Sequence, residues 1–358
     1  MSAETAAAPQ DARVAAATAH WRARFVNNGV DLDTFDATVA RIRTWDRWCA
    51  EWAESGRRFE EIAEAAEAEG RRVTAGQAWL RAAFCHHFGK FVFMDDLAQQ
   101  RAAHDRTVAC FGKGMWALEP PAERVEIPYR DGVRLAGLLR RPPGPARPPV
   151  VVMVPGLDSV KEELQPVADV LLRRGLATLA VDGPGQGEAE YELAIEPAYE
   201  RPVAAIVDWL RSRTHLDHSR VGLFGVSLGG YYAVRAAARE PRLKAAVGLA
   251  GPYDLGSVWD PLPEVTKAAF RHRSRSQDER QAKERASELT LAGIERTVCP
   301  TLLVHGRLDR IIPHSEAERA ARIAGVELAT YEEGNHGVTN LAFESRAMMA
   351  DWLARRLA

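Results

Sequence analysis

The hydrophobic pattern divides the chain into two parts. From about Ala12 to Leu118, apolar residues recur at helical spacing and strand-like alternation is almost absent. Beyond that point, short β-branched or aliphatic runs alternate with helical stretches. The first part therefore predicts an all-helical region, and the second predicts a mostly parallel sheet covered by helices.

Local signals in the first part agree with a helical bundle. Trp45, Trp48 and Trp52 fall at i, i+3 and i+7, on one helix face. Gly70 ends a run rich in Glu and Ala, as a helix C-terminus requires. The segment from Thr74 to Gln77 resembles a capping box, so we expect the next helix to start there.

A domain boundary is predicted at Glu119-Pro120-Pro121. Proline lacks the amide donor and its ring clashes with the preceding turn, so a helix cannot continue through this segment. We therefore expect a helical N-terminal cap domain over residues 1–120 and a second domain over residues 121–358. The binding pocket is expected between them, a preferred location for small-molecule sites.

The second domain opens with a predicted hairpin around Asp131-Gly132, whose flanks, Arg124 to Arg130 and Val133 to Arg140, alternate like paired strands. The runs that predict the next strands are Val150 to Val154, Ala177 to Val181, Val221 to Phe224, Ala245 to Leu249, Thr301 to Val304 and Glu327 to Glu332. Between the fourth and fifth of these runs, Gly251 to Thr290 interrupts the rhythm with a Trp/Pro patch and a charged stretch. Two interpretations stay open for it, a lid insertion and a solvated helix face.

Composition and charge exclude several functions. The 358 residues include 47 basic and 49 acidic side chains, so no global field holds nucleic acid or an anionic membrane. Met1 to Gln10 contain no basic cluster followed by an apolar region, and no stretch approaches a bilayer-spanning length. We expect a cytoplasmic protein with a small-molecule substrate. The four cysteines show no C-x-x-C spacing, which argues against disulfides and against a zinc site.

The most specific motif is the G-x-S-x-G sequence around Ser227. It directly follows the predicted strand Val221 to Phe224 and directly precedes an Ala-rich helix. A sharp strand-to-helix turn of this kind strains the serine backbone, needs small neighbours and exposes the hydroxyl above the sheet. Ser227 is the predicted nucleophile.

A serine hydroxyl is a poor nucleophile until a base takes its proton, so a histidine and an orienting acid are required. Asp309 comes just after the strand Thr301 to Val304, and His336 just after Glu327 to Glu332. The order Ser, Asp, His is that of α/β-hydrolases. We predict His336 as general base and Asp309 as the acid that orients it.

Backbone amides must also face the oxyanion of the tetrahedral intermediate. We assign the amide of Leu228 and that of Leu157 in the loop after Val154, where Gly156 allows the chain to turn. Asp158 in the same loop has two interpretations, a contact to the substrate or a structural role as helix cap or as partner of Lys161.

Two further motifs support a resemblance. Gly156-Leu157-Asp158-Ser159, followed by Lys161-Glu162-Glu163, and then Asp182-Gly183-Pro184-Gly185-Gln186-Gly187-Glu188, resemble the α/β-hydrolase branch that contains the dihydroxypseudooxynicotine hydrolases and the fungal heptaketide hydrolyases. The resemblance implies an α/β-hydrolase fold with a helical N-terminal domain. It also implies cofactor-independent hydrolysis of a carbon-carbon bond beside a ketone in an aromatic or polyketide-like substrate, an oxyanion-loop acid that contacts substrate, matched here by Asp158, and a homodimer.

The residues leave other functions open. The same triad serves an esterase, a thioesterase or an acyltransferase, because fold and triad do not determine the substrate. A non-catalytic binding protein on this fold would be expected to have a broken triad or to lack the elbow glycines, and neither is seen.

Overall fold

The computed structural model describes residues 10–358, which form two compact units that meet between Ala117 and Leu118. The expectation that no leader segment precedes the fold rests on Met1 to Gln10, of which residues 1–9 lie outside the described residues. No helix in the described part is long and apolar enough to cross a membrane. All four cysteines are described, and each is buried and free.

The first unit is helical, as predicted. Its helices are α1 (Ala12–Asn27), α2 (Leu32–Arg41), α3 (Trp48–Ala68), α4 (Arg72–Lys90) and α5 (Leu97–Gly114), with short 3-10 turns at Trp45–Arg47 and Met115–Ala117. Trp45, Trp48 and Trp52 are all buried, but Trp45 lies in the first 3-10 turn and only Trp48 and Trp52 lie on α3.

The predicted start of α4 was wrong. Gly70 does follow α3 with φ of +73°, which places it in the left-handed conformation typical of a helix C-terminus. However, α4 begins at Arg72, so Thr74 and Gln77 lie inside it rather than at its cap. The turn at Gly70 reverses the chain within so few residues that the next helix starts before the capping-box sequence.

The second unit contains, within residues 10–358, one eight-stranded sheet in the order β1-β2-β4-β3-β5-β6-β7-β8. β1 to β2 and β2 to β4 are antiparallel, and every other neighbouring pair is parallel. The strands are β1 (Glu123–Pro128), β2 (Arg134–Arg140), β3 (Pro149–Val154), β4 (Ala177–Val181), β5 (Asp217–Val226), β6 (Leu243–Leu249), β7 (Arg296–Gly306) and β8 (Ala324–Tyr331). The predicted hairpin and parallel sheet are confirmed.

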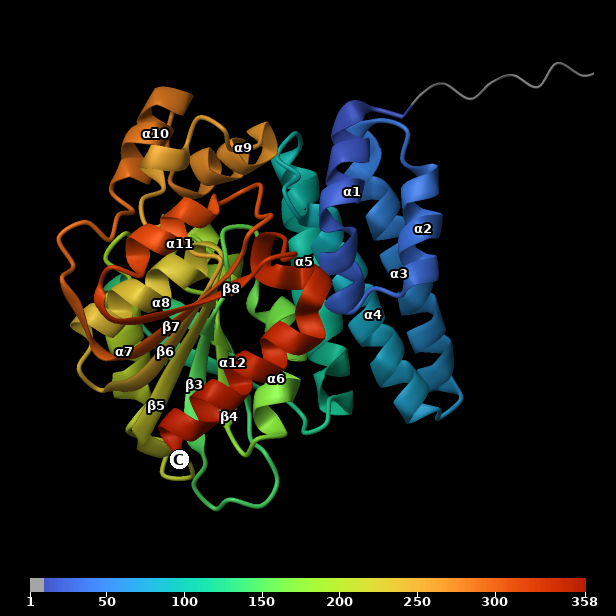
Figure 1. Cartoon of the computed structure of the whole chain (residues 1–358). Coiled ribbons are helices and arrows are strands. Elements are labelled where there is room, and N and C mark those ends of the chain that lie inside the picture. The colour runs from blue at the N-terminus through green and yellow to red at the C-terminus, as the bar shows by residue number, and fades with distance from the viewer. Residues whose placement is uncertain (1–9) are drawn as a thin grey trace, which may run out of the picture. The chain divides into compact units, whose positions relative to one another are not determined.

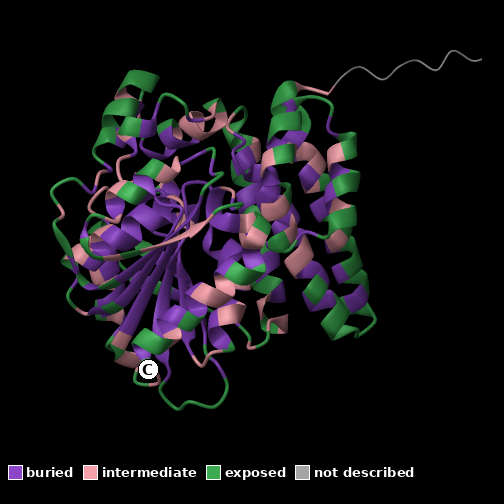
Figure 2. Ribbon diagram, viewed as in Figure 1, coloured by how far each residue is buried: buried purple, intermediate pink, exposed green. Residues whose placement is uncertain are grey.

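Helices cover both faces of this sheet (Figure 1). α6 (Gln165–Leu172) and α12 (Ala342–Leu357) pack against strand residues such as Val151 and Val247 in one apolar cluster. Successive residues of a strand point to opposite faces of the sheet. Gly248 follows Val247 on β6, and a Cβ on Gly248 would contact α8 (Leu228–Arg239), so α8 lies on the face opposite to α6 and α12. The central strands β3, β4 and β6 are almost entirely buried (Figure 2), which explains their continuous apolar runs, whereas the edge strands β1 and β8 are partly exposed.

The remaining helices of the second unit are α7 (Glu200–Leu210), α11 (His314–Ala320) and the pair α9 (Glu264–Arg273) and α10 (Glu279–Ser287). α9 and α10 belong to the segment that interrupts the strand rhythm. The ends of that segment are held together, because Asp254 and Thr290 form a β-bridge. Most of α10 is exposed, as expected for a solvated helix, whereas the last residue of α9 is fully buried.

Candidate active site

Ser227 occupies a sharp turn between β5 and α8. Its φ of 58° and ψ of −122° lie in a region that non-glycine residues rarely adopt. The turn is held by the Ser227 amide, which donates to the Leu249 carbonyl on β6 at 2.7 Å. It also needs glycine at position 225, where a Cβ would lie 1.9 Å from the Gly229 carbonyl oxygen. The geometry is that of a nucleophile elbow.

The structure brings Ser227, His336 and Asp309 together from three strand ends. His336 Nε2 lies 3.0 Å from Ser227 Oγ, and His336 Nδ1 lies 2.7 Å from Asp309 Oδ2. All three residues follow the carboxyl ends of parallel strands, which meet at one edge of the sheet. The contacts form one continuous chain from hydroxyl to imidazole to carboxylate.

Asp309 is fixed independently of His336. Its Oδ1 accepts hydrogen bonds from the amides of Ile311 at 2.8 Å and Ile312 at 2.9 Å, which leaves Oδ2 for the imidazole. Burial works to raise the pKa of Asp309, but the His336 and His305 rings and the backbone amides leave it below its usual value. His305 Nε2 donates to the Ile312 carbonyl at 2.9 Å.

The loop after β3 lies directly against Ser227. A Cβ on Gly156 would come within 3.0 Å of Ser227 Cβ and 3.5 Å of its Oγ. Among the described residues, neither the amide of Leu157 nor that of Leu228 donates to an intrachain acceptor. Both donors predicted for the oxyanion therefore remain available beside the hydroxyl.

Asp158 makes an ion pair that the sequence did not indicate. Its Oδ1 lies 3.0 Å from Nη1 of Arg273, the last residue of α9. The predicted pair with Lys161 was wrong, because Lys161 is directed to other acids. The N-cap residue of the next helix, Lys161–Leu164, is Val160. Arg273 also binds the Leu157 carbonyl through Nη1 and Glu190 through Nε, at 3.0 Å for the latter.

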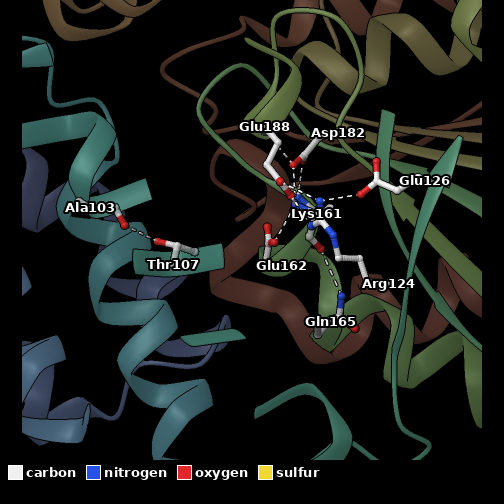
Figure 3. A network of polar contacts seen from close by, with 9 residues as sticks. All are labelled: Ala103, Thr107, Arg124, Glu126, Lys161, Glu162, Gln165, Asp182 and Glu188. Atoms are coloured by element: carbon white, nitrogen blue, oxygen red, sulfur yellow. Dashed lines mark hydrogen bonds and ion pairs between the residues drawn. The ribbon is translucent and has the colours of Figure 1, made fainter. Parts of the chain in front are cut away.

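The motifs around Lys161 and Asp182 meet in a buried ionic network (Figure 3). Lys161 Nζ lies 2.8 Å from Asp182, 2.7 Å from Glu162 and 2.6 Å from Glu188. Burial opposes its charge, but these carboxylates hold the pKa of Lys161 above its usual value. Burial raises the pKa of Glu162, although the charge of Lys161 opposes this. For Glu188 burial acts in the same direction, but Arg124 and Lys161 outweigh it and lower the pKa to about 2.

The same network determines where the loops run. Asp182 Oδ1 accepts from the Lys161 amide at 2.8 Å and Oδ2 from the Glu188 amide at 3.1 Å. Gly187 passes so close that a Cβ there would lie 2.0 Å from Asp182 Oδ2, and its φ is +46°. The Gln186 side chain in turn donates to the carbonyls of Pro155 and Gly156, at the base of the loop beside Ser227. The motif from Asp182 to Glu188 therefore holds the loop from Gly156 to Lys161 in place through hydrogen bonds.

Among residues 10–358, one cluster has the geometry of metal ligands. Glu60, His86 and Cys110, all buried in the helical unit, place ligand atoms within 4.8 Å of one another. These atoms already interact, since His86 Nε2 lies 2.6 Å from Glu60 and Arg106 also binds Glu60. Burial lowers the pKa of His86 to about 4, so it donates to Glu60 as a neutral ring. The cluster is a hydrogen-bonded core contact.

Comparison with known proteins assigns the chain to a family. Residues 21–261 match the family model described as FrsA-like esterase. The chain belongs to the FrsA-like family of α/β-hydrolases. It is 34% identical over 336 residues to 2,6-dihydropseudooxynicotine hydrolase of Paenarthrobacter nicotinovorans, an alignment that covers 92% of this chain and 90% of the relative. The predicted branch is thereby confirmed.

The chain is also similar to a solved structure and to a fungal hydrolase. The crystal structure of 2,6-dihydroxy-pseudo-oxynicotine hydrolase superposes with a TM-score of 0.86 at 31% identity, over 94% of this chain and 96% of that one. The 20-hydroxy-prefusarin hydrolase FUS2 of Gibberella moniliformis is 34% identical over 245 residues, which cover 64% of this chain and 58% of the relative. The α/β-hydrolase fold with a helical N-terminal region is confirmed.

Proposed function

We propose that this hydrolase cleaves a carbon-carbon bond beside a ketone in an aromatic or polyketide-like substrate, with Ser227, His336 and Asp309 as catalytic triad. The observation that carries the proposal is the continuous hydrogen-bond chain, 3.0 Å from hydroxyl to imidazole and 2.7 Å from imidazole to carboxylate. The similarity to a pseudooxynicotine hydrolase over 92% of the chain supports the bond type.

The proposed reaction begins when Ser227 Oγ attacks the ketone carbon and its proton passes to His336 Nε2. The amides of Leu157 and Leu228 stabilise the oxyanion of the adduct. Collapse of the adduct breaks the carbon-carbon bond, and the leaving carbon takes the proton from the His336 imidazolium. Departure requires an arene or enolate that delocalises the carbanion. Water, activated by His336, then releases the acyl group from Ser227 as a carboxylic acid.

Asp158 is proposed to contact the substrate, for instance by holding a phenol of an aromatic ketone. Its carboxylate is ion-paired with Arg273. A carboxylate paired with a guanidinium serves as a hydrogen-bond acceptor, whereas His336 Nε2 lies 3.0 Å from Ser227 Oγ and takes up its proton in the first step. We therefore assign proton delivery to His336 and orientation of the substrate to Asp158.

A second candidate is an esterase, a thioesterase or an acyltransferase with the same triad, and the family description as FrsA-like esterase favours it. The two candidates differ in product. Ketone cleavage releases a carboxylic acid and a carbon acid, whereas ester hydrolysis releases an alcohol and acyl transfer shows no net hydrolysis. A non-catalytic binding protein would release none of these.

The test is intact-protein mass after treatment with a fluorophosphonate, which phosphonylates an activated serine. Wild type, Ser227→Ala and His336→Ala are compared, with Ser212→Ala as matched control because Ser212 is exposed at the end of α7. Aryl ketones and aryl esters are then tested for turnover, with the products identified by mass.

We expect labelling of wild type and Ser212→Ala, and its loss in Ser227→Ala. Equal labelling of wild type and Ser227→Ala would contradict the triad. Turnover of esters with no cleavage of any ketone would favour the second candidate. A well-folded wild type that neither labels nor turns over any substrate would favour a binding protein.

A further inference from the structure

Arg273 is the charged residue that joins the α9 segment to the loop beside Ser227. It lies 115 positions from Asp158 in sequence, at the end of α9, and its side chain is completely buried. Its backbone carbonyl accepts a hydrogen bond from the Ile195 amide at 3.0 Å, so the main chain is held as well as the side chain.

The guanidinium of Arg273 binds two consecutive residues of the loop, Leu157 and Asp158. Nη1 donates to the Leu157 carbonyl and to Asp158 Oδ1, and Nε donates to Glu190 Oε2 at 3.0 Å. A planar guanidinium with fixed donor directions can hold these acceptors together, whereas a lysine would present one point charge. Burial opposes the charge of Arg273, but Glu190 and Asp158 leave its pKa above the usual value.

Gln186 binds the same loop at the residues just before Leu157. Its amide nitrogen lies 3.3 Å from the Gly156 carbonyl oxygen. In a trans peptide the C=O and the N–H of the next residue point in opposite directions, so this contact directs the Leu157 amide away from Gln186. Arg273 fixes the following carbonyl, that of Leu157. The peptide group that carries the predicted oxyanion donor is therefore held on both sides.

We propose that Arg273 is a positioning residue for the reaction, which holds the Leu157 amide toward the oxyanion through the Leu157 carbonyl and Asp158. The proposal rests on the proposed function of Ser227. It also makes the end of α9 a support of the loop beside Ser227.

The experiment compares wild type, Arg273→Lys and Arg273→Met. A third variant, Arg273→Met/Asp158→Asn/Glu190→Gln, also removes the negative charges of the two buried carboxylates that Arg273 binds, and so tests the role if Arg273→Met fails to fold. Arg235→Met is the matched control, because Arg235 forms a two-point ion pair with Glu200 between α7 and α8. Each variant is assayed for kcat and KM with p-nitrophenyl esters, for the rate of fluorophosphonate labelling at Ser227, and for thermal unfolding.

A displaced oxyanion donor lowers kcat by about 100-fold. We expect that loss in Arg273→Lys, with KM changed less than about threefold, a parallel fall in labelling rate, and no such loss in Arg235→Met. The triple variant should show the same fall in kcat and labelling rate, and its KM should also rise because Asp158, the proposed substrate contact, is changed. Relative to Arg273→Met, Arg273→Lys should regain more of the lost thermal stability than of the lost kcat. An arginine with a structural role alone would regain both together. A folded Arg273→Lys and a folded triple variant with wild-type kcat and labelling rate would overturn the positioning role alone. Labelling that persists in Ser227→Ala would overturn the proposed function instead.

Discussion

Replacement of Lys161 by methionine probes the ionic network that shapes the loops around the site. Lys161 and Asp182 are fully buried and Glu162 is nearly so, and the ammonium of Lys161 lies 2.8 Å from Asp182 and 2.7 Å from Glu162. Methionine keeps most of the unbranched side chain, one atom shorter, but removes the charge, so the buried carboxylates lose their cation. Breaking a buried pair in this way costs about 3–5 kcal/mol of unfolding free energy.

The structure also predicts which acid absorbs the change. Burial already raises the pKa of Glu162, whereas the Asp182 carboxylate is held by two backbone amides. Glu162 should therefore take up a proton, and Lys161→Met/Glu162→Gln should recover about 1–2 kcal/mol of the loss, the desolvation cost of an unpaired polar group.

The assay is urea unfolding at pH 7, followed by tryptophan fluorescence and circular dichroism. The matched control is Lys267→Met, whose partners Glu264 and Glu279 are exposed, so its midpoint should move little. A Lys161→Met protein as stable as this control would refute the reasoning. So would a double variant less stable than Lys161→Met.

Three further changes test neighbouring features. Glu188→Gln should flatten the acid limb of stability, because the pKa of Glu188 is lowered from 4.5 to about 2 when folded, so its contribution of about 3 kcal/mol is present above pH 4.5 and is lost as pH falls towards 2. The control is Glu126→Gln, because Glu126 is the more exposed acid that also pairs with Arg124. Acid-unfolding curves that are equal for the two variants would contradict this prediction. Gly187→Ala should lower the thermal midpoint by several degrees, because its Cβ would meet Asp182 at 2.0 Å; an unchanged midpoint would show that the turn relaxes. Asp309→Asn should keep the fold but lower kcat by about 10³- to 10⁴-fold, since the amide cannot orient His336 in the required tautomer; activity near wild type would exclude the proposed orienting role.

Much of the fold was predictable because it depends on short-range patterns. The apolar runs predicted the parallel strands, and Asp131-Gly132 predicted the hairpin, with φ of 56° and 78° at these residues in the structure. The start of α4 was not predictable in this way. The sequence from Thr74 to Gln77 satisfies a capping rule, but the turn at Gly70 starts the helix two residues earlier, at Arg72.

The candidate site shows the same division. Ser227, Asp309 and His336 could be found from sequence because each follows a predicted strand, and parallel strands end at a common edge. The partner of Asp158 could not be found, because Arg273 sits in a charged stretch that is typical of a solvated helix, and only its burial distinguishes it. Lys161 likewise stands three positions from Asp158 but binds Asp182 across the fold.

The sequence by itself determined the order of elements, the elbow and the residues at the strand ends, since these follow from local periodicity and from backbone requirements that glycine, proline and serine express directly. Only the tertiary structure decided which charges pair. Ion pairs such as Arg273 with Asp158 and Glu190 join residues about 80 to 115 positions apart. No periodic pattern records such distances, because they depend on how the loops at the edge of the sheet pack against one another.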